Sequence, residues 1–171
     1  EMRSYCDALH CAEVTAISVE PAVSAQFRRA GITAGLLPLQ TFLRHHQERL
    51  PQVEARDGRS YRLFGHCTER AILQASSDEW HDVFAAAGLE LDDAGVGCCG
   101  MAGLFGHMEA NVGMSRAIFE KDWQRALVPD KLVPLATGFS CRDQIARFWD
   151  AKPRHPVEVL AGHCARRLHR D

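Results

Sequence analysis

Short apolar runs rich in β-branched residues alternate in this sequence with longer runs of helical spacing, and this alternation restricts the fold more than any other feature. Such alternation is typical of strand–helix–strand units, whose strands pair in parallel. We therefore predict an α/β fold with a mainly parallel sheet flanked by helices. The expected strands cover residues 15–19, 61–64, 89–96 and 132–136, and the expected helices cover 2–14, 22–29, 38–50, 77–87, 109–127, 142–149 and 156–167.

The composition limits the class of protein. The chain has 171 residues, enough for one domain with its own hydrophobic core. Its 20 Lys and Arg residues nearly balance its 22 Asp and Glu residues, so no nucleic-acid-binding surface is expected. Neither a transmembrane segment, which needs about 18 apolar residues, nor a signal peptide is predicted. Because the chain opens with Glu1-Met2, we interpret residues 1–171 as a single domain of a longer protein.

Cysteine is the unusual residue of this sequence. Four of the seven cysteines follow expected strands: Cys67 follows 61–64, Cys98 and Cys99 follow 89–96, and Cys141 follows 132–136. In a parallel sheet, the junctions after the strands lie together at the carboxyl edge, where open α/β sheets bind their ligands. We therefore expect these four sulfurs to meet at the carboxyl edge of the sheet.

The residues around these cysteines favour a metal site. Unpaired N–H groups and the dipole at a helix N-terminus lower the pKa of a thiol there, and metal ligation requires the thiolate. An odd number of cysteines in a chain of this length argues against a secreted disulfide framework. Glycines also frame the junctions and leave space for an inorganic group: Gly65, Gly97, Gly100, Gly103, Gly106 and Gly138.

The adjacent pair Cys98-Cys99 bears on the identity of the metal. Neighbouring Cα atoms are about 3.8 Å apart, so a disulfide between these two residues would be strained. Structural zinc sites usually space their ligands by two or more residues, whereas an iron–sulfur cluster binds each sulfur through a different iron. The spacing favours an iron–sulfur cluster and leaves zinc as the alternative.

Three motifs resemble a known family. GHCTER (65–70), GVGCCGMAGLFGH (95–107) and ATGFSCRDQI (136–145) together resemble the cysteine-rich CCG domain, which occurs in heterodisulfide reductases. They are most similar to the C-terminal region of FAD-linked oxidases of the D-lactate and D-2-hydroxyglutarate dehydrogenase type. Those proteins continue with an HPV segment like residues 155–157, so the chain resembles the C-terminal part of such an oxidoreductase.

The resemblance implies a ligand set and partners. Cys67, Cys98, Cys99 and Cys141 would bind an iron–sulfur cluster, with 4Fe–4S expected and zinc as the alternative. FAD would belong to the parent protein, and the flavin and ferredoxin-like domains of that protein would be the partners, since the chain has neither a flavin motif nor a C-x-x-C-x-x-C run. Many members have C-x-x-C in the last motif, but Gly138 stands three residues before Cys141 here, so four ligands are expected rather than five.

Two histidines flank the cysteine motifs. His66 and His107 are predicted to donate hydrogen bonds to the sulfurs and so to tune the potential of a cluster. Cys6, Cys11 and Cys164 lie on expected helices outside the motifs, and we expect them to have no function.

These observations predict an electron-transfer domain of a flavin-dependent 2-hydroxy-acid oxidoreductase, which passes electrons from FAD to an acceptor and does not catalyse a reaction by itself. Two alternatives stay open: a structural zinc module that docks other domains, and a thiol–disulfide reductase domain that uses Cys98 or Cys99. The expected location is cytoplasmic, with attachment to the inner membrane only through the parent complex.

Overall fold

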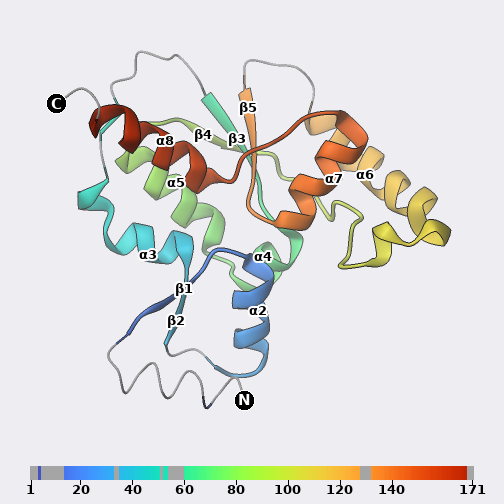
Figure 1. Ribbon diagram of the computed structural model, residues 1–171, viewed down its shortest axis with the longest axis horizontal. Coiled ribbons are helices and arrows are strands. Elements are labelled where there is room, and N and C mark those ends of the chain that lie inside the picture. Colours follow the sequence, from blue (N-terminus) through green and yellow to red (C-terminus); the bar gives the residue numbers. More distant parts are fainter. Residues whose placement is uncertain are drawn as a thin grey trace.

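A three-stranded parallel sheet forms the centre of the molecule (Figure 1). The computed structural model describes residues 4, 14–32, 35–50, 52–53, 60–127 and 132–168. The strands β3 (Ser60–Phe64), β4 (Leu91–Asp93) and β5 (Leu132–Ala136) lie in the order β4-β3-β5. Tyr61 pairs in parallel with Leu91 on one side and with Val133 on the other. The predicted α/β class with parallel strands is confirmed.

Helices cover both faces of this sheet, because successive side chains of a strand point to opposite faces. Tyr61 and Leu63 of β3 face one hydrophobic core, which contains Trp80 and Phe84. Three helices pack on this face: α3 (Leu39–His45), α5 (Ser76–Ala86) and α8 (Pro156–Leu168). Figure 1 shows them together on one side of the sheet.

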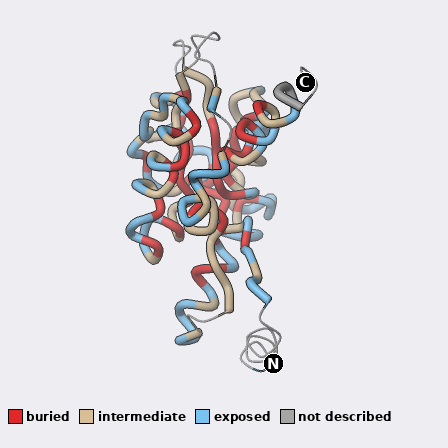
Figure 2. Tube along the Cα trace, turned by 90° about the vertical axis from the view of Figure 1, so that its left-hand side faces the viewer, coloured by how far each residue is buried: buried red, intermediate tan, exposed pale blue. Residues whose placement is uncertain are grey.

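Phe64 belongs to a second core on the opposite face. This core is built by α6 (Val112–Ala126) and α7 (Phe139–Trp149), which contribute Phe119, Trp123 and Ile145. The rings of Phe64 and Trp123 lie 5.1 Å apart between their centroids, so the middle strand packs directly on α6. The buried residues accordingly run through the middle of the molecule between two helical layers (Figure 2).

A second, two-stranded parallel sheet lies beside α2 (Figure 1). It consists of β1 (Ala16–Ser18) and β2 (Leu36–Pro38), which α2 (Pro21–Arg29) connects. The sequence pattern predicts β1 and α2 but not β2, and it places Pro38 in the first turn of a helix. Pro38 instead ends β2 and caps α3 in an extended conformation (φ −59°, ψ 145°).

Several boundaries differ from the sequence predictions. Only Leu91–Asp93 of the expected strand 89–96 form a strand, β4. Residues 94–99 have no regular secondary structure. The expected helix 109–127 begins as a 3₁₀ turn, η4 (Glu109–Asn111), before α6. The expected helix 38–50 ends at His45 and is followed by the 3₁₀ turn η1 (Gln47–Arg49). The helix expected over 2–14 lies almost entirely outside the described residues. Two short elements complete the fold, α4 (Cys67–Ile72) and η3 (Phe105–His107).

Candidate metal centre

The four cysteines of the motifs all follow strands of the three-stranded sheet. Cys67 is the first residue of α4, shortly after the end of β3. Cys98 and Cys99 lie in the irregular segment after β4, and Cys141 lies in the first turn of α7 after β5. Since β3, β4 and β5 are parallel, the three junctions share the carboxyl edge of the sheet.

Each of the four cysteines lies close enough to another of them for the pair to influence a pKa within the group. Cys98 accepts hydrogen bonds from the thiols of Cys67 and Cys99, and Cys99 also forms a hydrogen bond with Cys141. Cys99 and Cys141 are buried, whereas Cys67 and Cys98 are half-buried. We refer to these four residues as the cysteine site. Three loops that are distant in sequence thus bring these cysteines near one another, and the predicted ligand set stays a prediction.

Within the cysteine site the negative charge lies on Cys98. The hydrogen bond from Cys67, followed by the one from Cys99 and by the backbone N–H of Gly100 (3.3 Å), lowers the pKa of Cys98 to about 2. The pKa of Cys67 is raised, first by its hydrogen bond to Cys98 and then by burial. The pKa of Cys99 is raised by its hydrogen bonds to Cys141 and Cys98 and by burial.

Two helices of the second core hold the backbone of the adjacent pair Cys98-Cys99 in place. Gln144 of α7, which is fully buried, donates one hydrogen bond to the carbonyl of Cys99 and another to the hydroxyl of Ser115, both at 2.8 Å. Ser115 of α6 in turn donates to the carbonyl of Gly100 at 2.9 Å. Gly100 has a φ of +88°, and a Cβ atom there would overlap the carbonyl oxygen of Ser115. Only glycine fits this close approach.

His66 lies against the cysteine site and caps α4. Its Nδ1 accepts a hydrogen bond from the backbone N–H of Thr68 (3.2 Å), and its Nε2 lies 3.4 Å from the hydroxyl of Ser140. A Cβ atom on Gly138 would overlap the ring of His66, so the ring occupies the space that a side chain at position 138 would need.

His107 is placed differently from His66. Its Nε2 lies 3.7 Å from a carboxylate oxygen of Asp143, and its side chain is half-exposed. The described contact of His107 therefore connects η3 to α7 and involves no sulfur of the cysteine site. The predicted role of His107 as a hydrogen-bond partner of the sulfurs stays a prediction.

Glu69 connects two of the cysteine loops, a role that the sequence pattern did not predict. Its carboxylate is 2% exposed and accepts hydrogen bonds from the hydroxyls of Thr137 and Ser76 and from the backbone N–H of His66. With His66 it forms a capping box, in which residues three positions apart satisfy each other's backbone N–H groups. The spacing H-x-x-E in GHCTER was the available signal.

The donor set fits an iron–sulfur cluster or a zinc ion, since both bind four cysteine thiolates. Within the described ranges, no group of three or more His, Cys, Asp or Glu side chains is arranged so that it could hold a metal ion. Cys164 lies on α8 as a half-buried free thiol, while Cys6 and Cys11 lie outside the described residues.

Comparisons with known proteins identify similar sequences in one kind of enzyme. The chain is 37% identical over 161 residues to the D-2-hydroxyglutarate dehydrogenase of Pseudomonas putida, an alignment that covers 90% of this chain and 16% of that enzyme. It is 41% identical over 116 residues to the enzyme of the same name from Haemophilus influenzae, and 43% identical over 105 residues to that of Escherichia coli. Those alignments cover 67% and 60% of this chain, and 11% and 10% of the enzymes.

The chain therefore spans less than a fifth of the length of these curated relatives. No family model and no solved structure matches it. In the described residues, no helix is both long enough and apolar enough to cross a membrane. By sequence, the chain is thus similar to one portion of D-2-hydroxyglutarate dehydrogenases.

Proposed function

We propose that this chain is the electron-transfer domain of a larger, FAD-dependent 2-hydroxy-acid dehydrogenase of the D-2-hydroxyglutarate type, and that its cysteine site binds a 4Fe–4S cluster. The observation that carries the proposal is the meeting of four thiols from three loops at the carboxyl edge of one sheet. The similarity to D-2-hydroxyglutarate dehydrogenases supports the choice of reaction. The free thiols suit a reducing compartment such as the cytoplasm.

When bound, the cluster would supply one-electron transfer. The residues of the chain hold the thiolates and adjust their environment. The lowered pKa of Cys98 keeps one thiolate ready to bind metal, and the N–H of Gly100 donates to its sulfur. Hydrogen bonds to ligating sulfurs raise the reduction potential because they stabilise negative charge. Cys99 and Cys141 are buried, and their burial limits the access of water to their side of the cysteine site.

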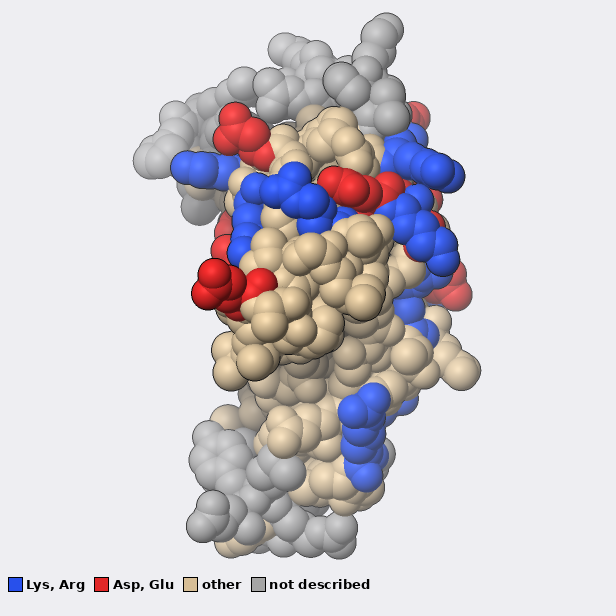
Figure 3. Space-filling model, turned by 90° about the vertical axis from the view of Figure 1, so that its right-hand side faces the viewer, with Lys and Arg blue, Asp and Glu red and all other residues tan. Residues whose placement is uncertain are grey.

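The surface beside the cysteine site suits contact with another domain. Residues 94–108 contain no Asp, Glu, Lys or Arg, and Leu104 and Met108 are 78% and 56% exposed. Figure 3 shows an uncharged area on the side of the molecule where this segment and α6 lie, next to a band of charged residues. An uncharged surface costs little desolvation when a partner covers it. The flavin and ferredoxin-like domains of the parent protein are the partners we propose.

The decisive experiment is anaerobic reconstitution with iron and sulfide, followed by assays of iron, sulfide and zinc, an absorption spectrum and electron paramagnetic resonance after reduction. We expect about four irons and four sulfides per chain. Ser variants of Cys67, Cys98, Cys99 and Cys141 should each lose most of the cluster. Cys164→Ser is the matched control, because Cys164 is a free thiol outside the cysteine site, and it should load like the wild type.

The other outcomes distinguish the alternatives. About one zinc per chain and no iron would replace the electron-transfer role by a structural zinc module, a donor set of four thiolates being equally suited to zinc. Metal-free protein that exchanges Cys98 with a disulfide substrate would favour a thiol–disulfide reductase. Equal loading of Cys67→Ser and Cys164→Ser would contradict the cysteine site as the ligand set.

A further inference from the structure

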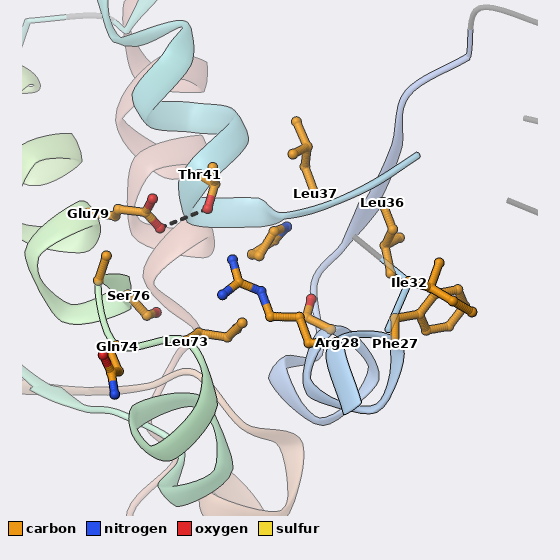
Figure 4. Close-up of a pocket in the computed structure, with 13 residues that line it drawn as sticks. Phe27, Arg28, Ile32, Leu36, Leu37, Thr41, Leu73, Gln74, Ser76 and Glu79 are labelled. Carbon is orange, nitrogen blue, oxygen red and sulfur yellow. Dashed lines mark hydrogen bonds between the residues drawn. The ribbon is translucent and has the colours of Figure 1, made fainter. Parts of the chain in front are cut away.

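A hollow lies between α2, β2, α3 and the start of α5, and none of the residues that line it belongs to the cysteine site (Figure 4). Its volume is about 140 Å³. Since one water molecule needs about 10–15 Å³ of such space, this is room for about ten water-sized groups. The hollow can therefore hold a small organic molecule.

Two opposite charges face each other across the polar part of the hollow. Figure 4 shows the guanidinium of Arg28 directed into it, with the carboxylate of Glu79 on the far side. Among the described residues Arg28 forms no ion pair. Glu79 accepts a hydrogen bond from the hydroxyl of Thr41 through Oε2, at 2.7 Å. A guanidinium binds a carboxylate through two parallel hydrogen bonds, and a carboxylate accepts from a hydroxyl or an ammonium group.

The remaining wall of the hollow is apolar. Phe27, Ile32 and Leu36 lie together at the end away from Glu79 (Figure 4). This end would accept a short aliphatic group and disfavour a second carboxylate, because among the described residues no cation other than Arg28 lines the hollow. The polar and apolar ends together define one chemical class of ligand.

We propose that this hollow binds a short monocarboxylate with a hydrogen-bond donor on the neighbouring carbon, that is, a small 2-hydroxy or 2-amino acid. Arg28 binds the carboxylate, Glu79 accepts from the hydroxyl or ammonium group, and the aliphatic end contacts Phe27, Ile32 and Leu36. The proposal involves neither metal nor flavin and does not depend on the function proposed for the cysteine site.

The test is a titration of the purified chain with four acids of equal length: 2-hydroxybutyrate, 2-aminobutyrate, 2-oxobutyrate and butyrate. Binding is measured by calorimetry or by ligand-observed NMR. We expect 2-hydroxybutyrate or 2-aminobutyrate to bind at least about ten-fold more tightly than butyrate and 2-oxobutyrate, which lack the donor. The tighter of the first two identifies the natural class. 2-Hydroxyglutarate should bind more weakly than 2-hydroxybutyrate, because its second carboxylate meets Glu79 or the apolar end. No binding of any acid, or equal binding of all four, overturns the proposal.

Three variants locate the binding. Arg28→Gln should weaken binding of the preferred acid at least about ten-fold, whereas Arg29→Gln should not, because Arg29, also exposed and next to Arg28 on α2, does not line the hollow. Glu79→Leu should remove most of the preference over butyrate, because leucine accepts no hydrogen bond. Equal effects of Arg28→Gln and Arg29→Gln would reveal unspecific attraction to the end of α2 and overturn the proposal. Cys67→Ser should bind the acid like the wild type, which separates this test from that of the cysteine site.

Discussion

The carboxylate of Glu69 accepts a hydrogen bond from the hydroxyl of Thr137, which lies 68 positions later in the chain. Glu69 belongs to α4, two residues after Cys67, and Thr137 belongs to the junction between β5 and Cys141. The same carboxylate binds the hydroxyl of Ser76 at the start of α5. One buried side chain thus joins the loops that present two of the four cysteines.

Replacement of Glu69 should destabilise the fold and disturb the cysteine site. Glu69→Ala leaves the hydroxyls of Thr137 and Ser76 without their buried acceptor, and hydrogen bonds to charged groups contribute about 1.5–3 kcal/mol each. We expect a loss of about 2–4 kcal/mol in the free energy of unfolding, measured by urea denaturation. Glu69→Gln keeps one acceptor oxygen and should lose about half as much.

Glu90 offers the matched control for Glu69. It also accepts a hydrogen bond from a serine hydroxyl, that of Ser60 at 2.9 Å, but at an exposed position. Glu90→Gln should change the free energy of unfolding by less than about 0.5 kcal/mol. A similar loss in the Glu69 and Glu90 variants would show that the buried network does not hold the loops.

Gly138 is predicted to be irreplaceable because of His66. An alanine methyl group at position 138 would overlap the imidazole, which must then leave its capping position on α4. We expect Gly138→Ala to cost about 1–3 kcal/mol and to shift the NMR signals of His66. Gly113→Ala is the control: it also lies near a helix N-terminus, but a Cβ atom there has no neighbour within 4 Å. That variant should be neutral or stabilise the protein by up to about 1 kcal/mol.

The sequence predicted the order of the elements better than their ends. The apolar runs of β3 and β5 and the motif cysteines identified the sheet edge, because strand–helix junctions are strongly patterned. The strand β2 was missed because three residues ending in proline carry no periodicity. The contacts around the site were missed for a different reason. Buried polar links such as Gln144 to Cys99 or Glu69 to Thr137 join residues that are 45 and 68 positions apart, and no local pattern announces them.

The histidine caps could have been found from spacing. His66 and His155 each accept, through Nδ1, a hydrogen bond from the backbone N–H two residues later, of Thr68 and Val157 respectively. In both cases a glutamate three residues later accepts from the backbone N–H of the histidine. Histidine is not among the preferred N-cap residues, so H-x-x-E was not interpreted as a helix start.

The thiol of Cys98 is predicted to react at unusually low pH in the reduced, metal-free protein. Its pKa, lowered to about 2 by the hydrogen bonds from Cys67 and Cys99, leaves it a thiolate at pH 5, whereas a cysteine of the unfolded chain has a value of 9.0. Alkylation at pH 5, followed by mass spectrometry, should therefore label Cys98 in the folded protein faster than in urea. Cys67→Ala removes one donor and should slow this labelling, and Cys164→Ala should leave it unchanged. Labelling of Cys98 only near pH 9 would contradict the hydrogen-bonded thiolate.

The last prediction concerns acid stability and His155. This residue is 3% exposed, its ring lies 5.6 Å from that of Trp80, and burial together with the positive charge of Arg142 lowers its pKa from 6.5 to about 4. The folded state thus favours the neutral imidazole, and its contribution to stability is complete above pH 6.5 and is lost as the pH falls towards 4. The difference corresponds to about 3 kcal/mol.

His155→Asn retains an N-cap residue but does not titrate, so it should reduce the fall in the free energy of unfolding between pH 7 and pH 4.5. His45→Asn, at an exposed position of α3, should leave that fall unchanged. Identical pH profiles for wild type and His155→Asn would show that another group governs acid unfolding.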